Sequence, residues 1–398
     1  MPTVLHLRTV TGRGGGPEKT LLTSPRFIGD GYDLRLAYIR PVDDKLYDMP
    51  MRAAKAGATL VDIPERHGLD PRTWRRLVDE IKQSRPAILH AHDYKTNVLA
   101  VLLGRRFGLP VMTTMHGYVS RGTRLNFYYR VDRWALRRMQ RIVAVSSDLL
   151  EHALQLGIAP RKCVLVENAI DCDEFSRRQS VAEVKRRLGL PVDRLLVGAV
   201  GRLCEEKGFD RLILAMDQLL SNGIDAQLCI LGEGGGRPEL ESLVARLGRQ
   251  DRVRLLGYQS NTIDWYQAMD VFALSSLREG TPNVVLEAMA MEVPLVATRI
   301  AGVPKLIEDG VNGLLVEPDD VTGMTEALKN LLSDGALRER LARAGRQTVE
   351  GKYSFALRMQ KIRALYDELL GRTPARGGEA QTDANQITSF QSESWATT

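Results

Sequence analysis

The fold of this chain is decided by residues 195–220, which read LLVGAVGRLCEEKGFDRLILAMDQLL. The run Leu195–Val200 is apolar throughout, which is typical of a parallel strand buried on both faces. A polar turn with a glycine at each end follows, Gly201–Gly208, and then a helical stretch. A strand, a turn and a helix in this order indicate an α/β fold, because parallel strands are joined by crossover helices.

The same rhythm extends almost from end to end. Further predicted strands are Val4–Leu7, Leu34–Ile39, Ala87–Ala91, Val111–Met115, Ile142–Ser146, Ala226–Leu231, Val253–Leu256, Val271–Ser275, Leu295–Thr298 and Gly313–Val316. Longer helical patterns separate them, so we predict parallel sheets with helices on both faces. At 398 residues the chain is too long for one ordinary core. We therefore expect two doubly wound, Rossmann-like α/β domains facing a central cleft, where ligands bind in such folds.

The division between the domains is expected near residues 167–178, a polar segment that follows a strand and precedes a helical stretch. The predicted bounds are 1–170 for an N-terminal domain, 171–352 for a C-terminal domain and 353–371 for a last helix. Residues 372–398 are rich in Gly, Ser, Thr and Gln with few apolar side chains, so we predict a disordered tail there.

The composition is that of a folded, water-soluble protein, with 44% hydrophobic and 26% charged residues. A net charge of +6 suits an anionic small molecule or a membrane surface and does not by itself indicate nucleic acid. The N-terminus does not resemble a signal peptide, and no run reaches the roughly 18 apolar residues of a spanning helix, so we expect a cytoplasmic protein. Four scattered cysteines without a Cys-x-x-Cys pair are expected to be buried, reduced thiols.

A glycine-rich loop, Gly12–Glu18, follows the first predicted strand. Glycines let a phosphate or a sugar approach the backbone, and the helix that follows offers N–H groups to an anion. A flexible connection explains the same residues equally well.

The turn Gly201–Gly208 carries two cations, Arg202 and Lys207, which would face the cleft in this architecture. Two cations beside a helix N-terminus suit a diphosphate and would stabilise it as a leaving group without a metal. Solvated surface charge is the plainer explanation for any such pair taken alone.

A third loop, Glu279–Glu287, follows the strand Val271–Ser275 and reads EGTPNVVLE. Pro282 is suited to a helix start, and two carboxylates on one side of the turn would grip vicinal hydroxyls of a sugar or ribose. The backbone N–H groups expected to face a ligand belong to Thr281, Asn283, Val284 and Val285. An ordinary capped helix with solvent-facing glutamates is the alternative.

Together these motifs resemble the family 4 retaining glycosyltransferases of GT-B fold. The resemblance rests on the two glutamates separated by seven residues, the Gly-Arg…Lys-Gly turn and the early Gly-Gly-Pro-Glu loop. It continues through Ala301–Pro304, Asp309–Gly313 and Val145-Ser146, and covers roughly residues 4–370. This set of motifs, in this order, is far more specific than any one of them.

The resemblance implies a role for each matching position. Catalytic roles fall to Glu279, Arg202, Lys207 and His116, the last at the end of the strand Val111–Met115. The donor diphosphate would be bound by Arg202, Lys207, Gly15 and Gly16, the donor sugar by Glu279, Gly280, Thr281, Pro282, Asn283 and Val284, and the ribose by Glu287. The turn Gly257-Tyr258 would flank the base, and the last helix would cross back to brace the first domain.

The implied reaction moves a hexosyl group from a nucleoside-diphosphate sugar to a hydroxyl of a glycan or lipid-linked acceptor, with retention and with no metal or cofactor. UDP is the commonest nucleotide of the family, and no residue here decides between UDP, GDP and ADP. A nucleotide-sugar epimerase of the same overall fold is the alternative enzyme. A non-catalytic carbohydrate-binding protein is disfavoured, because it would be expected to lack Glu279 or Lys207.

Two other motifs suggest metals, and one stretch suggests a membrane. Asp171-Cys172-Asp173 spells Asp-x-Asp but lies in the predicted interdomain link, and His90-Ala91-His92-Asp93 has no evident third ligand, so we expect no metal site. In the stretch 121–141, a helical wheel places Arg130, Arg133, Arg137 and Arg141 on one side and Phe127, Val131, Trp134 and Ala135 on another. Peripheral membrane contact and an ordinary domain helix are both open for it.

Overall fold

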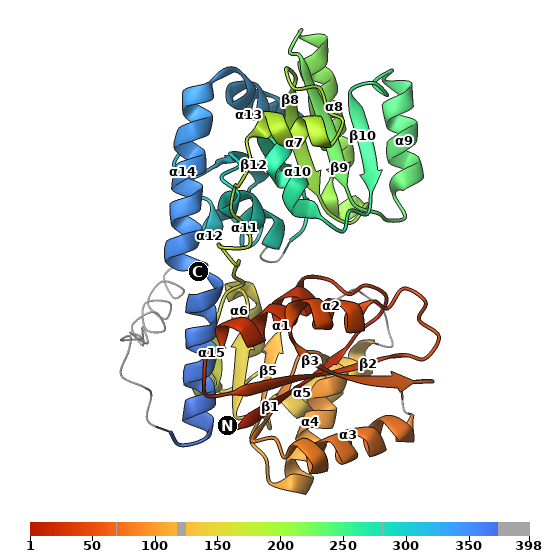
Figure 1. Ribbon diagram of the computed structural model, residues 1–398, viewed down its shortest axis with the longest axis vertical. Coiled ribbons are helices and arrows are strands. Elements are labelled where there is room, and N and C mark those ends of the chain that lie inside the picture. Colours follow the sequence, from red (N-terminus) through yellow and green to blue (C-terminus); the bar gives the residue numbers. More distant parts are fainter. Residues whose placement is uncertain (69, 118–124, 280–281, 373–398) are drawn as a thin grey trace, which may run out of the picture.

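The computed structural model describes residues 1–68, 70–117, 125–279 and 282–372, and it contains two α/β domains built on parallel sheets (Figure 1). The predicted fold class is confirmed. The first sheet has the strand order β3-β2-β1-β4-β5-β6-β7, and the second has the order β10-β9-β8-β11-β12-β13. Both orders reverse direction beside the first strand of the domain, which is where doubly wound folds bind ligands.

The first domain alternates strands and helices from the N-terminus. Its strands are β1 (Thr3–Thr9), β2 (Asp33–Pro41), β3 (Thr59–Glu65), β4 (Ile88–Ala91), β5 (Val111–Met115), β6 (Arg141–Ala144) and β7 (Cys163–Leu165). Its helices are α1 (Gly16–Phe27), α2 (Met49–Ala56), α3 (Pro71–Ser84), α4 (Tyr94–Phe107), α5 (Leu125–Leu136) and α6 (Ser147–Gln155), with a 3₁₀ turn, η1 (Pro160–Lys162).

The second domain continues the pattern. Its strands are β8 (Leu195–Val200), β9 (Ala226–Leu231), β10 (Val253–Gly257), β11 (Val271–Leu274), β12 (Leu295–Thr298) and β13 (Leu314–Val316). Its helices are α7 (Val181–Arg187), α8 (Phe209–Ser221), α9 (Arg237–Arg246), α10 (Thr262–Ala268), α11 (Asn283–Ala290), α12 (Val303–Leu306), α13 (Val321–Ser333) and α14 (Gly335–Lys352), with a 3₁₀ turn, η2 (Glu205–Lys207). The last helix, α15 (Phe355–Leu369), follows α14.

The apolar run Leu195–Val200 forms β8, which lies at the centre of the second sheet between β9 and β11. Successive residues of β8 point to opposite faces, so Leu196 packs into one buried cluster and Val197 and Ala199 pack into another. Helices cover both faces, which explains why this strand has no polar alternation.

Two strands of the first sheet, β3 and β7, were not predicted. Both are edge strands. β3 carries Asp62 and Pro64 and is only partly buried, which an edge tolerates because a side of the strand needs no hydrogen-bond partner. β7 is three residues long and has no fully buried side chain. Neither strand therefore shows the continuous apolar pattern of the central strands.

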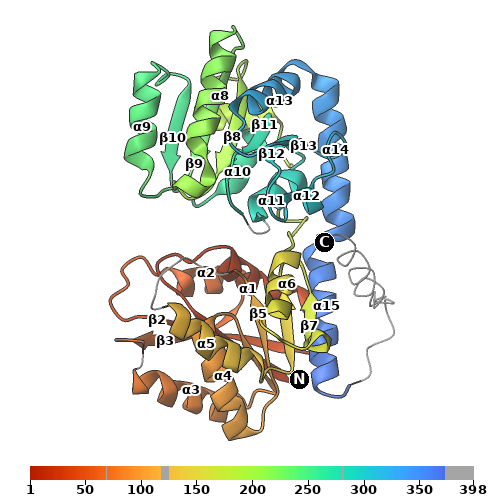
Figure 2. The same ribbon diagram turned by 180° about the vertical axis from the view of Figure 1, so that it is seen from behind.

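The chain passes between the two sheets at Ile170 and again at Ser354, and the two crossings are hydrogen-bonded to each other. Ile170 N donates to Tyr353 O at 2.9 Å, and Phe355 N donates to Ile170 O at 2.8 Å. α14 runs along one domain and α15 along the other, on the same side of the molecule (Figures 1 and 2).

α15 packs its apolar face on the first sheet although it follows the second domain in sequence. Its buried residues Phe355, Met359, Ile362, Leu365 and Tyr366 share one cluster with residues of β1, β2, β4, β5 and β6. Each such side chain contributes about 1.5–3 kcal/mol when fully buried. The hydrophobic effect therefore attaches α15 firmly to the first domain. Of the predicted tail, residues 373–398 lie outside the described part of the chain.

The basic stretch before β6 is a shorter helix than predicted. α5 ends at Leu136, so the prediction that Arg141 continues the same helical face is wrong: Arg141 opens β6 and forms an ion pair with Glu368 of α15. Arg130 and Arg133 are exposed, and Ala135 is buried. The side chain of Phe127 lies outside the described part.

Within the described ranges, none of the helices combines the length and the apolar composition needed to span a membrane. The four cysteines, Cys163, Cys172, Cys204 and Cys229, carry free thiols, but only Cys229 is fully buried. The expectation of buried thiols is therefore wrong for the other three.

Candidate functional site

The turn after β8 brings Lys207 against the loop after β11. Gly208 has φ 56°, and a Cβ atom there would lie 2.3 Å from the carbonyl oxygen of Ser275, so only glycine fits. The Ser275 hydroxyl donates to Lys207 O at 2.9 Å. These contacts fix the turn at the carboxyl end of the sheet, next to the ligand-binding edge expected for this fold.

Lys207 Nζ forms an ion pair with Glu279 Oε1, and the Ser276 hydroxyl donates to the same oxygen at 2.8 Å. The two side chains are 21% and 12% exposed, so the pair is largely shielded from water. The structure thus joins two residues predicted from separate motifs. Arg202 lies on the same turn but is exposed, and a hydrogen bond to the Cys204 sulfur raises the pKa of Arg202 above its ordinary value.

The loop that follows Glu279 leads into α11. Gly280 and Thr281 lie outside the described residues. Pro282 occupies the N-cap of α11. Val285 N already donates to Pro282 O at 3.1 Å, so the prediction that its N–H faces a ligand is wrong. The Asn283 side-chain oxygen Oδ1 is buried and has no hydrogen-bond partner among the described residues.

Glu287, on the second turn of α11, is buried and is held from both domains. Lys19 Nζ of α1 approaches Glu287 Oε1 at 2.5 Å, and the Tyr266 hydroxyl donates to Oε2 at 2.9 Å. Burial and the neighbouring carboxylate raise the pKa of Tyr266, which therefore stays a neutral donor. Neither Lys19 nor Tyr266 was predicted from the sequence.

The glycine-rich loop meets α11 across the domain interface. A Cβ atom on Gly16 would lie 2.8 Å from Asn283 Nδ2, so the start of α1 approaches the start of α11 closely. Gly15 is the N-cap of α1, and its N–H donates to Glu18 Oε2 at 2.6 Å. Glu18 also pairs with Arg8 at 2.8 Å. The loop is therefore held in place by its own hydrogen bonds, and these contacts argue against a flexible connection.

A small cavity lies between the domains beside these contacts. It is lined by Lys19, Thr20 and Thr23 of α1, by Ala169, Ile170, Asp171, Glu174 and Phe175 of the connecting segment, by Asn283 and Glu287 of α11, and by Phe355. Of the predicted site residues, Asn283 and Glu287 line this cavity, whereas Arg202, Lys207, Glu279 and His116 do not.

The turn predicted to flank a base also contacts the first domain. The guanidinium carbon of Arg13 lies 4.4 Å from the centre of the Tyr258 ring, which is half exposed. Gly257, just before it, has φ 74°. The loop after β10 and the loop after β1 therefore meet across the interface.

Asp171 of the Asp-x-Asp sequence is occupied by structural contacts. Its Oδ1 accepts hydrogen bonds from the backbone N–H groups of Asp173 and Glu174, and its Oδ2 pairs with Arg26 at 2.6 Å. These contacts give it a role in shaping the interdomain link.

His116 lies at the end of β5 and is partly buried. Its Nε2 is 3.1 Å from His92 Nδ1. Burial first, and then the cations Arg8 and Arg358, hold the pKa of His116 well below its ordinary value. His116 is therefore a neutral ring at neutral pH.

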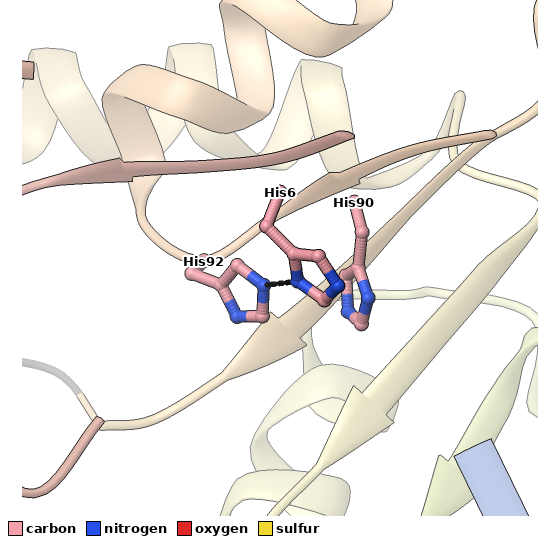
Figure 3. Close-up of side chains that lie close together, drawn as sticks. All are labelled: His6, His90 and His92. Carbon is pink, nitrogen blue, oxygen red and sulfur yellow. Dashed lines mark hydrogen bonds between the residues drawn. The ribbon is translucent and has the colours of Figure 1, made fainter. Parts of the chain in front are cut away.

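The prediction that no third ligand lies near His90 and His92 is wrong. His6 of β1 lies beside both, and one nitrogen from each of the three rings lies within 4.8 Å of the others (Figure 3). These nitrogens already have hydrogen-bond partners: His6 Nδ1 meets His92 Nε2 at 2.8 Å, and His90 contacts Tyr366 and Thr114. These contacts form a buried hydrogen-bond network.

The sequence carried a weak signal for the residues that were missed. His6 interrupts the apolar strand Val4–Leu7, and Lys19 lies one turn into the helix after the glycine-rich loop. A polar residue inside a buried strand, or a cation at a helix start near the cleft, is a candidate site residue. Their partners lie 86 and 268 positions away, and no local pattern identifies them.

Family models match two parts of the chain: "Glycosyltransferase Family 4" at residues 24–174 and "Glycosyl transferases group 1" at residues 180–348. The alpha-D-kanosaminyltransferase of Streptomyces kanamyceticus is 33% identical over 71% of this chain and 78% of its own length. An Escherichia coli enzyme, UDP-Gal:alpha-D-GlcNAc-diphosphoundecaprenol alpha-1,3-galactosyltransferase, is 26% identical over 73% and 77%, respectively.

Among solved structures, that of Anabaena HepE in complex with UDP superposes with a TM-score of 0.80 at 19% identity. The match covers 92% of this chain and 100% of HepE, and it shows a shared fold. These relatives lend no support to the epimerase alternative. The chain is a glycosyltransferase of group 1 type and belongs to family 4, with the GT-B fold.

Proposed function

We propose that the protein transfers a hexosyl group from a UDP-sugar to a hydroxyl of a glycan or lipid-linked acceptor, with retention and without a metal. The observation that carries this proposal is the Lys207–Glu279 ion pair at the ligand-binding edge of the second sheet. A cation there suits the diphosphate, and a carboxylate beside it suits the hydroxyls of the attached sugar.

The choice of UDP draws on similar proteins. HepE has been crystallised with UDP and with UDP-glucose, and the name of the Escherichia coli relative specifies UDP-galactose. The name of the same relative also specifies its acceptor, a sugar linked to a lipid through a diphosphate. Exposed Arg130, Arg133 and Arg137 would suit the anionic surface around such an acceptor.

Each site residue then has a defined task. Arg202 and Lys207, with the backbone at Gly15 and Gly16, would bind the diphosphate. The sugar would be held by Glu279 and by the segment Gly280–Val284, and His116 would approach it from the first domain. Glu287 would accept hydrogen bonds from the ribose diol, in place of the contact that Lys19 makes with it.

The transfer step would need little covalent participation by the protein. The bond between the anomeric carbon and the diphosphate oxygen breaks, the acceptor oxygen bonds to the same face of that carbon, and the acceptor proton passes to the departing diphosphate. The protein orients the two partners and stabilises the charge that develops on the leaving group. Closure of the two domains would exclude water and so limit hydrolysis of the donor.

A thermal-shift screen tests the donor assignment. UDP-sugars are expected to raise the melting temperature, because a ligand that binds only the folded state adds about 2.7 kcal/mol at a hundredfold excess over its dissociation constant. GDP- and ADP-sugars should give smaller shifts, and EDTA should change none of them. The absence of a shift with every nucleotide sugar, or a shift lost in EDTA, would contradict the proposal.

The ribose contact is tested by Glu287→Gln. We expect UDP to bind about tenfold more weakly, because a neutral amide replaces a charge-assisted hydrogen-bond acceptor. The substitution also removes the ion pair that Glu287 forms with Lys19 in the free protein. Glu292→Gln, an exposed position just beyond the same helix, is the control and should bind UDP normally. Isothermal titration measures both. Equal affinity in the two variants would remove Glu287 from the ribose site.

A further inference from the structure

A continuous chain of hydrogen bonds runs from the candidate site into the core of the first domain. We call it the histidine chain. In order from the cleft its members are His116, His92, His6, Tyr366, His90 and Thr114. The successive heavy-atom distances are 3.1, 2.8, 3.3, 2.9 and 2.8 Å. Apart from His116, every member is buried.

The histidine chain is assembled from four elements. β1 contributes His6, β4 and the residue after it contribute His90 and His92, β5 and its end contribute Thr114 and His116, and α15 contributes Tyr366. The Tyr366 hydroxyl joins two halves, because it meets Nε2 of His6 and Nδ1 of His90. The final helix therefore completes a network that ends at the predicted reacting centre.

The four rings are neutral. Burial lowers the pKa of His6 to about 3 and holds the pKa values of His90, His92 and His116 well below the ordinary value. Two cations face the group: Arg8 on β1 donates to His92 O at 2.6 Å, and buried Arg358 on α15 lines a small cavity that the four histidines also line. Neither offers a negative charge that would favour an imidazolium.

Neutrality restricts the protons of the chain. A neutral imidazole has one N–H and one bare nitrogen, and a hydroxyl has one hydrogen, so each member donates to one neighbour and accepts from the other. If the protons point toward the cleft, all four histidines carry hydrogen on Nδ1. If they point away from it, all four carry hydrogen on Nε2. A change of direction at Tyr366 would leave its buried hydroxyl hydrogen without an acceptor in the chain, which is costly.

The geometry points to a positioning role for His92, His6 and Tyr366: they hold His116 in one tautomer and one ring orientation. His116 uses Nε2 within the chain, and Nδ1 has no partner among the described residues. Nδ1 is therefore the atom presented to the donor sugar, as a fixed donor or a fixed acceptor. This inference rests on the proposed role of His116 at the sugar, and it makes α15 part of the active site.

The tautomers can be read directly from ¹⁵N spectra of protein labelled at histidine. The chain has six histidines, so the spectrum is sparse, and single substitutions assign it. We expect the four members of the histidine chain to share one tautomer in the absence of donor. Tyr366→Phe should leave His116 as a mixture of tautomers, because the direction imposed from the far half is lost.

Tyr32→Phe is the matched control. Tyr32 packs 5.4 Å from the Tyr366 ring, and its hydroxyl donates to Asp367 Oδ1 of α15 at 2.6 Å, outside the histidine chain. The Tyr32→Phe substitution removes one buried hydrogen bond of α15 and should leave the His116 signals unchanged. Thermal melts of both variants show whether each is folded, and similar melting temperatures exclude a general loosening of α15 as the cause.

The kinetic readout is UDP release from the nucleotide sugar selected by the thermal screen. Tyr366→Phe is expected to lower kcat about tenfold with KM unchanged, the equivalent of one hydrogen bond of about 1.4 kcal/mol. Tyr32→Phe should keep the parent kcat. Mixed tautomers in the parent protein, or identical His116 spectra in Tyr366→Phe and the parent, would overturn the inference. The spectra need no donor, so failure of the proposed transfer reaction would be seen separately.

Discussion

Lys207→Ala is expected to reduce kcat for sugar transfer by a factor on the order of 10²–10³, the usual cost of removing one group that stabilises charge in a transition state. Lys207 is the cation nearest the carboxylate assigned to the donor sugar, and the Gly208 turn fixes it in place. Negative charge builds up on the diphosphate as it departs, so the loss should appear in kcat more than in KM.

Steady-state UDP release measures this effect, with melting temperature and far-UV circular dichroism as tests of folding. Lys329→Ala removes an exposed lysine of α13 and should retain full activity. Lys207→Arg keeps a cation and should lose less than the alanine variant. If Lys207→Ala turned over within threefold of the parent while folded, Lys207 would not be the residue that stabilises the leaving group.

Mild acid is expected to destabilise the first domain steeply because of its buried histidines. In the unfolded protein a histidine titrates near pH 6.5. In the folded protein the pKa values of the four histidines of the histidine chain lie well below that value, with His6 at about 3. Above pH 6.5 both states are neutral and stability does not depend on these rings. Below pH 6.5 the unfolded state binds protons that the native state does not bind, so the free energy of unfolding falls as pH falls.

The size of this effect follows from linkage. Each ring contributes about 1.4 kcal/mol between pH 7.5 and 5.5, and four together contribute about 5 kcal/mol, a large part of a typical domain's stability. Urea unfolding at the two pH values, followed by fluorescence, measures it. His90→Gln should flatten the pH dependence by about a quarter, while His67→Gln, an exposed histidine outside the cluster, should leave it unchanged. A free energy of unfolding that is equal at both pH values would contradict the prediction.

The central elements of both sheets were predictable because their signals are local. Strands such as β8 and β11 are buried on both faces and are therefore apolar at every position. The edge strands β3 and β7 were not predicted, because each has a neighbouring strand on one side only and therefore lacks the continuous apolar pattern. The same locality let the loops after β8 and β11 be identified as candidate site segments, since a loop at the carboxyl end of a parallel strand follows that strand directly in sequence.

By itself, the sequence determined two α/β domains, the loops that carry Lys207 and Glu279 at the edge of the second sheet, and the helix that carries Glu287 there. Only the tertiary structure decided the partners of these groups. Lys19 reaches Glu287 from 268 positions away, and His6 joins His92 across 86. Such pairs depend on how the two sheets and α15 pack. A hydrogen bond or an ion pair needs its atoms within about 3 Å, and no periodicity in a sequence specifies a distance between segments that meet only when the whole chain has folded.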